Sequence, residues 1–448
     1  MSSSWPRAIR DPIHNIIRFG NNACDRLLWK LIDTTEFQRL RRIKQVGMSE
    51  LVFPGATHTR FAHSVGVMHV ARRMLDSLAE KGVSVEERTR IVVLCAALLH
   101  DTGHGPFSHA FEAVTKIKHE KYTNEVISDP DTEVNRRLRE HDSTLPELVA
   151  QFLDESPDSS CPPFPPFFTH LVHSQLDADR LDYLLRDSQA TGTHYGRFDL
   201  DWLLDHLSAD TTKGCLFLDR KCVYAAEAYL FARHHMYQSV YFHKATRAAE
   251  VMLRILFRRY QDLLKEGEDV AEQQESWVPD VPPPVLRVFR APGRITLTDY
   301  LELDDSLLTG FFKQCAVSED PVLRRMGSGL KKRRLLKGTD VPEDARHEIA
   351  QFSEKAKAIV RKEGFEPDYF LVSDSPSDTS YKGDDPLGDS HPVQVYVEDN
   401  AGKKHELSQL AKPAAALREK HIRLRYYFPP DCRQEIEEVA DQLWGSNE

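Results

Sequence analysis

The sequence lacks long apolar runs and paired cysteines. No stretch approaches the ~20 apolar residues that a membrane-spanning helix needs. The seven cysteines are scattered, their number is odd, and none forms a C-x-x-C pair. This pattern is typical of reduced thiols and excludes a zinc knuckle or a disulfide framework. The first residues, MSSSWPRAIRDPIH, lack the apolar core of a signal peptide, so we expect a cytoplasmic protein that does not enter a membrane.

The sequence also has fewer basic than acidic residues. It contains 59 Lys and Arg and 69 Asp and Glu, which give a net charge of −10. This balance argues against general binding to nucleic acid or to a membrane surface. It leaves room for a local basic pocket, which is sufficient for a small phosphorylated ligand. The 41% hydrophobic and 29% charged residues describe a soluble globular chain.

The N-terminal half is patterned mainly for helices. Apolar residues recur at helical spacing over 25–48, with a break at which Asp33 or Thr34 can cap a second helix. FAHSVGVMHVARRMLDSLAEKG predicts an amphipathic helix that ends at Gly82. SVEERTRIVVLCAALLHD predicts the next helix, with Ser84 and Glu87 in capping-box spacing.

Further helices are predicted beyond a proline-rich surface loop at 154–168. SQLDADRLDYLLRDSQATG predicts a helix that closes near Gly192, and a long helical stretch with breaks follows at 223–265.

The character of the chain changes after this stretch. Residues 266–287 are acidic and then proline-rich, as expected of a linker or an exposed loop. PDYFLVSD, HPVQVYVEDNAGKKHEL and HIRLRYYF predict strands, the second with a hairpin turn at 399–402, and PPDCRQEIEEVADQLW predicts a terminal helix. We therefore expect a mainly α fold in three parts: a helical core at 1–265, a linker and helical, basic regulatory segment at 266–344, and a small α/β lobe at 345–448.

The stretch LCAALLHDTGHGPFSHAF ends an apolar helix with several histidines and an aspartate. Core helices rarely end this way, because buried imidazoles and carboxylates need partners. His100 and Asp101 are adjacent at the loosening helix end, where both side chains can reach one ion. His63 on the preceding helix and Asp179 on a later helix supply the remaining candidate ligands. Such ligands suit a divalent transition metal, which activates water for attack on phosphorus.

These motifs carry a family resemblance. The sequence resembles the HD-domain superfamily of metal-dependent phosphohydrolases, whose ligand pattern is H…HD…D. It is most similar to the deoxynucleoside triphosphate (dNTP) triphosphohydrolases, through RDPIHNIIRF, VFPGATHTRFAHSVGV, LLHDTGHGPFSHAFE, LDADRLDYLLRD and RHHMYQSVYFHK. The resemblance implies a helical HD core and hydrolysis of dNTPs to deoxynucleoside and inorganic triphosphate. It also implies a divalent Fe, Mn or Zn ion, with Mg accompanying the triphosphate.

Carried over by position, the resemblance implies roles for individual residues. The implied metal ligands are His63, His100, Asp101 and Asp179. The implied substrate-binding residues are Arg60 and Arg180 for the triphosphate, Gln45, Tyr183 and Asp187 for the deoxyribose and its surroundings, and Tyr241 where a ring crowds the 2′ position. The implied catalytic residues are Asp101, His104, His109 and His119.

The chemistry agrees with these roles. A triphosphate carries about four negative charges, which arginines and protonatable histidines suit. The departing 5′ oxygen needs a proton, and a histidine provides one near neutral pH. We favour His109 as this acid, with His104 as the alternative and His119 and Glu120 as tuning partners. Close packing at Tyr241 would reject ribonucleotides.

Relatives of this kind are often oligomers with effector nucleotides at subunit interfaces, so the resemblance implies a homo-oligomer and a dNTP effector. The effector positions it implies are Asp33, Gln38, Arg41, Lys221 and Arg324. Asp219 and Ser208 depart from the basic residues of the animal enzymes, so effector preference does not transfer.

Two alternative functions stay open. One is an HD phosphodiesterase or nuclease acting on cyclic nucleotides or oligonucleotides, and the other is a catalytically silent nucleotide sensor. Lowering the dNTP pool would serve either housekeeping or defence against viruses and phages.

Overall fold

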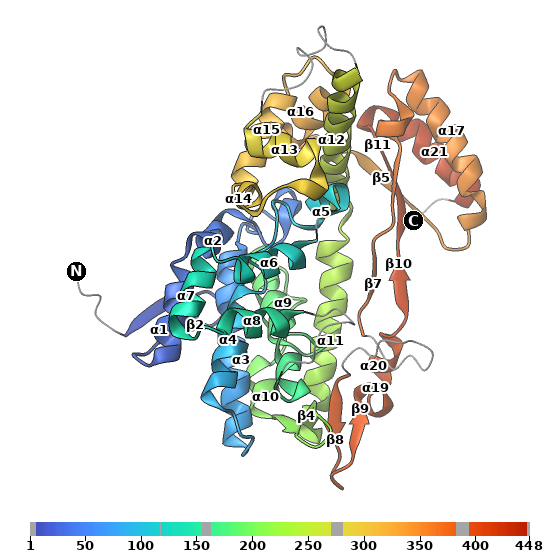
Figure 1. Cartoon of the computed structure of the whole chain (residues 1–448). Coiled ribbons are helices and arrows are strands. Elements are labelled where there is room, and N and C mark those ends of the chain that lie inside the picture. Colours follow the sequence, from blue (N-terminus) through green and yellow to red (C-terminus); the bar gives the residue numbers. More distant parts are fainter. Residues whose placement is uncertain (1–5, 117, 155–162, 270–280, 382–393, 446–448) are drawn as a thin grey trace.

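The computed structural model describes residues 6–116, 118–154, 163–269, 281–381 and 394–445. Its N-terminal part is a helical core in which α3 packs against α4 and α9 (Figure 1). The helices of this part are α1 (Ala23–Ile32), α2 (Thr35–Arg39), α3 (Arg60–Glu80), α4 (Glu87–Leu99), α5 (His109–Thr115), α6 (His119–Ser128), α7 (Glu133–His141), α8 (Leu145–Leu153), α9 (Ala178–Thr191), α10 (Leu200–Asp205), α11 (Val223–Met236) and α12 (Lys244–Asp269).

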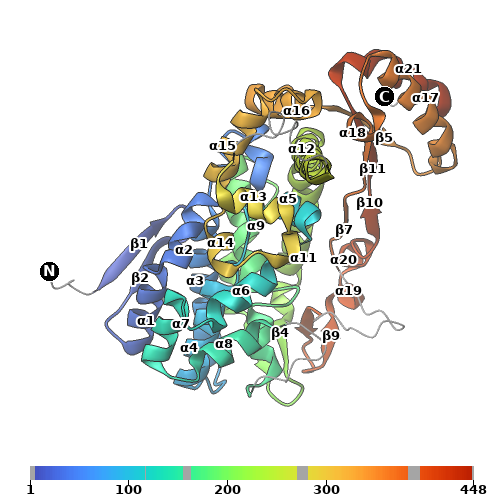
Figure 2. The ribbon, with the colours of Figure 1, turned by 45° about the horizontal axis from the view of Figure 1, so that its top comes forward.

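A second apolar core forms along α12, from Ala248 to Leu264. It collects side chains from α13, α15 and α16 and from the C-terminal lobe, in which α17 packs against α21 (Figure 2). The helices of this part are α13 (Pro283–Arg290), α14 (Leu297–Leu301), α15 (Asp305–Cys315), α16 (Pro321–Lys332), α17 (Ile349–Lys362), α18 (Pro367–Phe370), α19 (Leu407–Leu410), α20 (Lys412–Ala416) and α21 (Arg433–Trp444).

The sheets are small, and two of them draw on distant parts of the chain. β4 pairs in parallel with β8, so the C-terminal part adds strands to the core in the order β3-β4-β8-β9; the other sheets are β1-β2, β10-β7 and β5-β11-β6. The strands are β1 (Arg7–Asp11), β2 (Asn15–Phe19), β3 (Leu207–Asp210), β4 (Cys215–Asp219), β5 (Lys337–Val341), β6 (Val372–Asp374), β7 (Ser377–Thr379), β8 (Tyr396–Glu398), β9 (Lys404–Glu406), β10 (Lys420–Ile422) and β11 (Leu424–Phe428). The predicted mainly α fold with a C-terminal lobe is confirmed, while the domain boundaries stay predictions.

Several predicted helix ends are confirmed. Thr34 is the N-cap of α2, and α9 ends at Gly192, whose φ of +73° is the left-handed conformation that glycine tolerates. The helical stretch at 223–265 is broken by a π-helical turn at Tyr237–Tyr241. None of the described helices is long and apolar enough to cross a membrane. The six cysteines within the described residues are free thiols.

Three local predictions are wrong. The capping box at Ser84 does not form, because α4 begins at Glu87 and its N-cap is Glu86. PDYFLVSD is a short helix followed by a strand, since Pro367 suits the first turn of a helix. HIRLRYYF forms two strands, β10 and β11, with different partners. Of the loops expected at 154–168 and 266–287, residues 155–162 and 270–280 lie outside the described residues. The second loop is shorter than predicted, because α12 continues to Asp269 and α13 begins at Pro283.

Candidate metal and phosphate site

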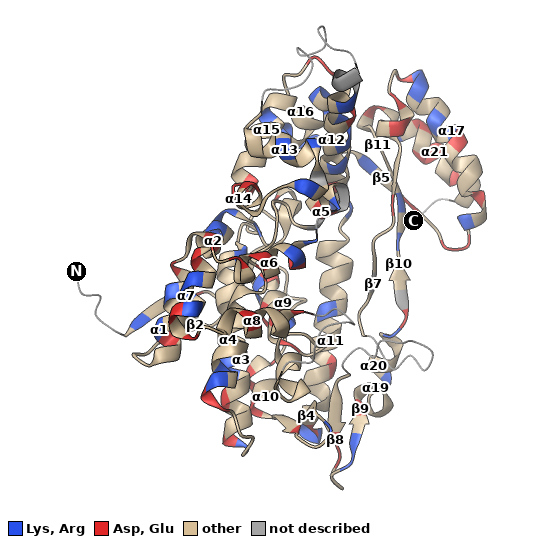
Figure 3. Cartoon of the chain, viewed as in Figure 1, with Lys and Arg blue, Asp and Glu red and all other residues tan. Residues whose placement is uncertain are grey.

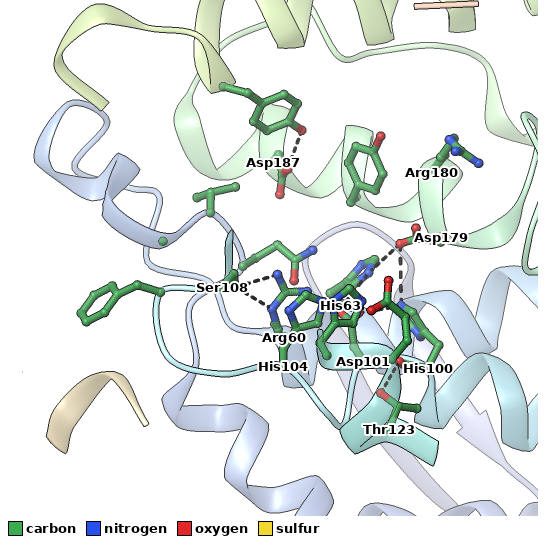
Figure 4. Close-up of a pocket in the computed structure, with 18 of the residues that line it drawn as sticks. Arg60, His63, His100, Asp101, His104, Ser108, Thr123, Asp179, Arg180 and Asp187 are labelled. Atoms are coloured by element: carbon green, nitrogen blue, oxygen red, sulfur yellow. Dashed lines mark hydrogen bonds and ion pairs between the residues drawn. The ribbon is translucent and has the colours of Figure 1, made fainter. Parts of the chain in front are cut away.

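Three helix ends meet at the HD motif. α3 carries His63 one turn from its start, α4 ends with His100 as its C-cap, and the first turn of α9 carries Asp179. The side chain of Asp177 accepts a hydrogen bond from the backbone N–H of Arg180 and so caps α9. Side chains from three helices that are distant in the sequence therefore point toward one another (Figure 4).

The four predicted metal ligands lie together. His63 Nε2 is 2.9 Å from Asp179 Oδ1 and 3.7 Å from Asp101 Oδ2. His100 Nε2 is buried and makes no hydrogen bond, although Asp101 Oδ1 is 3.3 Å away and Asp179 Oδ1 is 3.7 Å away. One ligand atom from each of His63, His100 and Asp179 lies within 4.8 Å of the others. This set of imidazole and carboxylate donors fits a divalent transition metal.

The carboxylates of the cluster are held ionised. Burial raises the pKa of Asp101, but Arg60 and His100 outweigh it and keep the pKa well below its usual range. Burial likewise opposes ionisation of Asp179, whose pKa is lowered by its contacts with His100 and His63. For His63, burial lowers the pKa, yet hydrogen bonds to Asp179 and Asp182 raise it to about 10. The cluster thus favours positive charge at its centre.

Asp182 supports the cluster from behind, and sequence reasoning missed it. The carboxylate is fully buried and accepts hydrogen bonds from His63 Nδ1 at 2.8 Å, from His14 Nε2 at 2.7 Å and from two nitrogens of Arg186 at 2.8 and 2.9 Å. Arg186 also reaches Asp11 at 2.9 Å. A carboxylate on one imidazole nitrogen orients the other toward a metal. The available signal was its spacing, one helical turn after Asp179.

Gly66 gives α3 room for this network. A Cβ there would lie 1.9 Å from Asp182 Oδ1 and 2.4 Å from Arg186 Nη2. We expect Gly66→Ala to lower the free energy of unfolding by about 1–3 kcal/mol through overpacking. Gly310→Ala on α15, where nothing lies within 4 Å of the added Cβ, should instead raise it by up to about 1 kcal/mol. Urea unfolding of both variants measures the difference, and equal effects would contradict this packing.

Arg60 lies beside the metal cluster. Its Nη1 donates to Asp101 Oδ2 at 2.5 Å, while Nε and Nη2 donate to Ser108 Oγ at 3.1 and 2.7 Å. Phe107 and Ser108 have φ values of +51° and +47°, which non-glycine residues adopt at a cost and mostly at functional sites. The guanidinium is thereby fixed at the wall of the pocket.

Two of the predicted histidines form a stacked pair. The rings of His104 and His119 lie 3.7 Å apart, and His119 Nδ1 donates to Glu112 Oε1 at 2.7 Å. Burial, Arg60 and His119 hold the pKa of His104 well below its usual range. Glu112 was missed, and Glu120, the expected partner, lies farther from His119 at 3.6 Å. The side chain of His109 lies outside the described residues.

Most of the predicted site residues line one cavity of about 980 Å³. Figure 4 shows Asp187 and Arg180 across it from His100 and Asp101. Tyr241 Oη donates to Asp187 Oδ2 at 2.6 Å, and His58, also missed, donates to Asp187 Oδ1 at 2.7 Å. The predicted site residues that line the cavity are Gln45, Arg60, His63, His100, Asp101, His104, His119, Asp179, Arg180, Tyr183, Asp187 and Tyr241; their individual roles stay predictions.

The five predicted effector residues do not all meet within one chain, although two of them contact each other. Gln38 accepts a hydrogen bond from Arg41 at 2.8 Å, and Asp33 pairs with Arg7 at 3.5 Å. Lys221 lies between β4 and α11, and Arg324 lies on α16. Figure 1 shows β4 and α16 at opposite ends of the molecule. Lys and Arg are mixed with Asp and Glu along the described helices (Figure 3). The effector site stays a prediction.

The helical core and its histidine–aspartate cluster define a metal-dependent phosphohydrolase of the HD type. Residues 60–156 match the HD domain and residues 198–275 match the HD associated region. The uncharacterized protein YwfO of Bacillus subtilis is 34% identical over 96% of this chain and 93% of its own length. The chain therefore belongs to the HD-domain phosphohydrolase family.

Two further relatives bear on function and fold. The deoxynucleoside triphosphate triphosphohydrolase SAMHD1 homolog of Dictyostelium discoideum is 28% identical over 75% of this chain and 60% of its own length. The crystal structure of a phosphohydrolase from Bacteroides thetaiotaomicron is 27% identical, covers 95% of this chain and 100% of its own, and superposes with a TM-score of 0.77.

Proposed function

We propose that the protein hydrolyses dNTPs to deoxynucleoside and inorganic triphosphate. The observation that carries the proposal is one cavity with the HD cluster and Arg60 on one wall and the Tyr241–Asp187 pair on the other. A cavity with these two walls suits a nucleotide, whose phosphates would face the first wall and whose sugar would face the second. The similarity to SAMHD1 proteins supports the same substrate class.

The reaction joins a water oxygen to the α-phosphorus and breaks the bond between this phosphorus and the 5′ oxygen. His63, His100, Asp101 and Asp179 would hold a divalent metal, which supplies charge stabilisation and a more acidic water. Arg60 offers a fixed guanidinium to the phosphate oxygens. It cannot leave Asp101 and Ser108 easily, because these contacts are buried.

The departing 5′ oxygen takes a proton from a histidine in this proposal. Glu112 accepts a hydrogen bond from Nδ1 of His119, which leaves Nε2 for proton transfer, and His119 lines the cavity. The surroundings of His104 disfavour its protonated form, because burial, Arg60 and His119 hold its pKa well below the usual range. We therefore assign proton donation to His119 or His109, with His104 neutral.

The test is triphosphate release from each of the four dNTPs, alone and with the other three as activators, in Mn²⁺, Fe²⁺ or Zn²⁺ with Mg²⁺. We expect inorganic triphosphate and deoxynucleoside in equal amounts, and little turnover of ribonucleotides because Tyr241 crowds the sugar. Release of nucleoside monophosphates from single-stranded DNA, without triphosphate release, would instead identify a nuclease. Turnover of no substrate by the metal-loaded protein would overturn the proposal.

A further inference from the structure

The segment that joins α14 to α15 contacts the loop between α4 and α5, which we call the HD loop. Tyr300 Oη donates to the backbone oxygen of Gly103 at 2.8 Å. The buried Arg39 links the same two segments, since its Nε donates to the Leu303 oxygen and its Nη1 to the His104 oxygen, both at 2.9 Å. The loop that carries the catalytic residues is therefore fixed by a segment nearly 200 residues later in the chain.

Asp305, the first residue of α15, makes the most specific of these contacts. Its side chain is buried, Oδ1 accepts the backbone N–H of Phe107 at 2.9 Å, and Oδ2 accepts that of Lys44 at 2.9 Å. Phe107 and the residue after Lys44, Gln45, line the cavity, whereas Asp305 is not among its lining residues. One carboxylate thus joins two loops of the pocket from outside it.

These two loops enclose Arg60. Phe107 and Ser108 have positive φ, and the turn they form aims Ser108 Oγ at the guanidinium. On the other side, the Arg60 N–H donates to the oxygen of Ile43, the residue before Lys44, at 2.9 Å. Without an acceptor for the Phe107 N–H, the strained turn would lose a restraint that offsets its cost.

We propose that Asp305 is a positioning residue for hydrolysis, which orients Arg60 toward the triphosphate by holding the Phe107–Ser108 turn and the Lys44 loop together. This inference rests on the proposed function. It states that Asp305, a residue outside the pocket, sets the position of the Arg60 guanidinium that binds phosphate. Asparagine cannot replace the carboxylate, because its single side-chain oxygen accepts from one loop while its NH₂ group opposes the other N–H.

The first test compares Asp305→Asn with Asp304→Asn. Asp304 is the adjacent carboxylate, caps α15 and pairs with Arg42, so it controls for charge and for the helix start. We expect Asp305→Asn to lower kcat/KM for triphosphate release about 10- to 100-fold, as a misplaced binding group does, with unchanged metal content. Asp304→Asn should stay within about twofold of the wild type, because asparagine also caps a helix and neither Asp304 nor Arg42 lines the cavity. Equal kcat/KM values for the two variants would overturn the inference.

A double-variant cycle separates positioning from general stability. Ser108→Ala removes the acceptor for Arg60 without touching Asp305, and we expect it to lower kcat/KM as well. If Asp305 acts through Ser108, adding Asp305→Asn to Ser108→Ala should cost less than about threefold further, because residues in one network are not additive. Losses that multiply would show a merely structural role and overturn the proposal.

Binding of inorganic triphosphate tests the role of Asp305 without requiring turnover, so this inference can fail or succeed independently of the proposed function. If the wild type turns over no dNTP, the proposed function fails, and calorimetry of the metal-loaded proteins with inorganic triphosphate still reports on Arg60. We expect the Kd to rise at least about tenfold in Asp305→Asn, consistent with loss of a charge-assisted contact, and to stay unchanged in Asp304→Asn. The same Kd in all three proteins would overturn the role of Asp305.

Discussion

Replacing His100 and Asp101 together by alanine is expected to lower triphosphate release by at least about a thousandfold, since a metal ion supplies several kcal/mol and each 1.36 kcal/mol is tenfold in rate. The double variant removes two of the four converging ligands and leaves His63 with Asp179. It also removes the carboxylate partner of Arg60. Metal analysis of the purified protein should show that bound transition metal is lost in parallel with kcat.

The matched control is a second histidine–aspartate pair remote from the pocket. His405 Nε2 donates to Asp399 Oδ2 at 2.8 Å in the hairpin of β8 and β9. Replacing both by alanine should leave kcat and metal content unchanged. An HD double variant that stays active without bound metal would contradict the metal site, and a wild type that binds metal and nucleotide without turnover would support a sensor.

The sequence stretch LLHDTGHGPFSH predicted much of the site because chemistry rather than packing dictates it. A buried histidine and aspartate that end an apolar helix need hydrogen-bonding, ionic or metal partners, and the structure places His63 and Asp179 beside them. The confirmed helices follow from apolar periodicity and from caps such as Gly192. Helix periodicity and caps are local signals, and the HD motif is a recognised pattern of ligands that are distant in the sequence.

The missed residues are those whose partners depend on the tertiary fold. Glu112, in the first turn of α5, accepts the hydrogen bond from His119 at the start of α6, and Glu120 lies farther from His119 at 3.6 Å. Asp305 meets Lys44 and Phe107 from more than 190 residues away, as their backbone hydrogen bonds show. A buried acceptor for a backbone N–H leaves no sequence pattern, so only the fold reveals it.

Removing the carboxylate of Asp182 is expected to have the largest effect on stability. Asp182→Ala leaves the buried Arg186 with Asp11 alone and leaves His14 without its acceptor. Breaking a buried pair in this way costs about 3–5 kcal/mol, and loss of the carboxylate behind His63 should weaken metal binding about 10- to 100-fold. Urea unfolding and chelator competition measure the two effects.

The control for Asp182 is an ion pair of the same kind on the surface. Asp201 contacts Arg73 at 2.7 Å, and its side chain is 80% exposed, so Asp201→Ala should cost no more than about 1 kcal/mol. Similar losses in the two variants would contradict a special role for the buried network. A loss of stability in Asp182→Ala with undiminished metal affinity would separate the two functions, because it would show that His63 keeps its orientation through Asp179 and the packing of α3 alone.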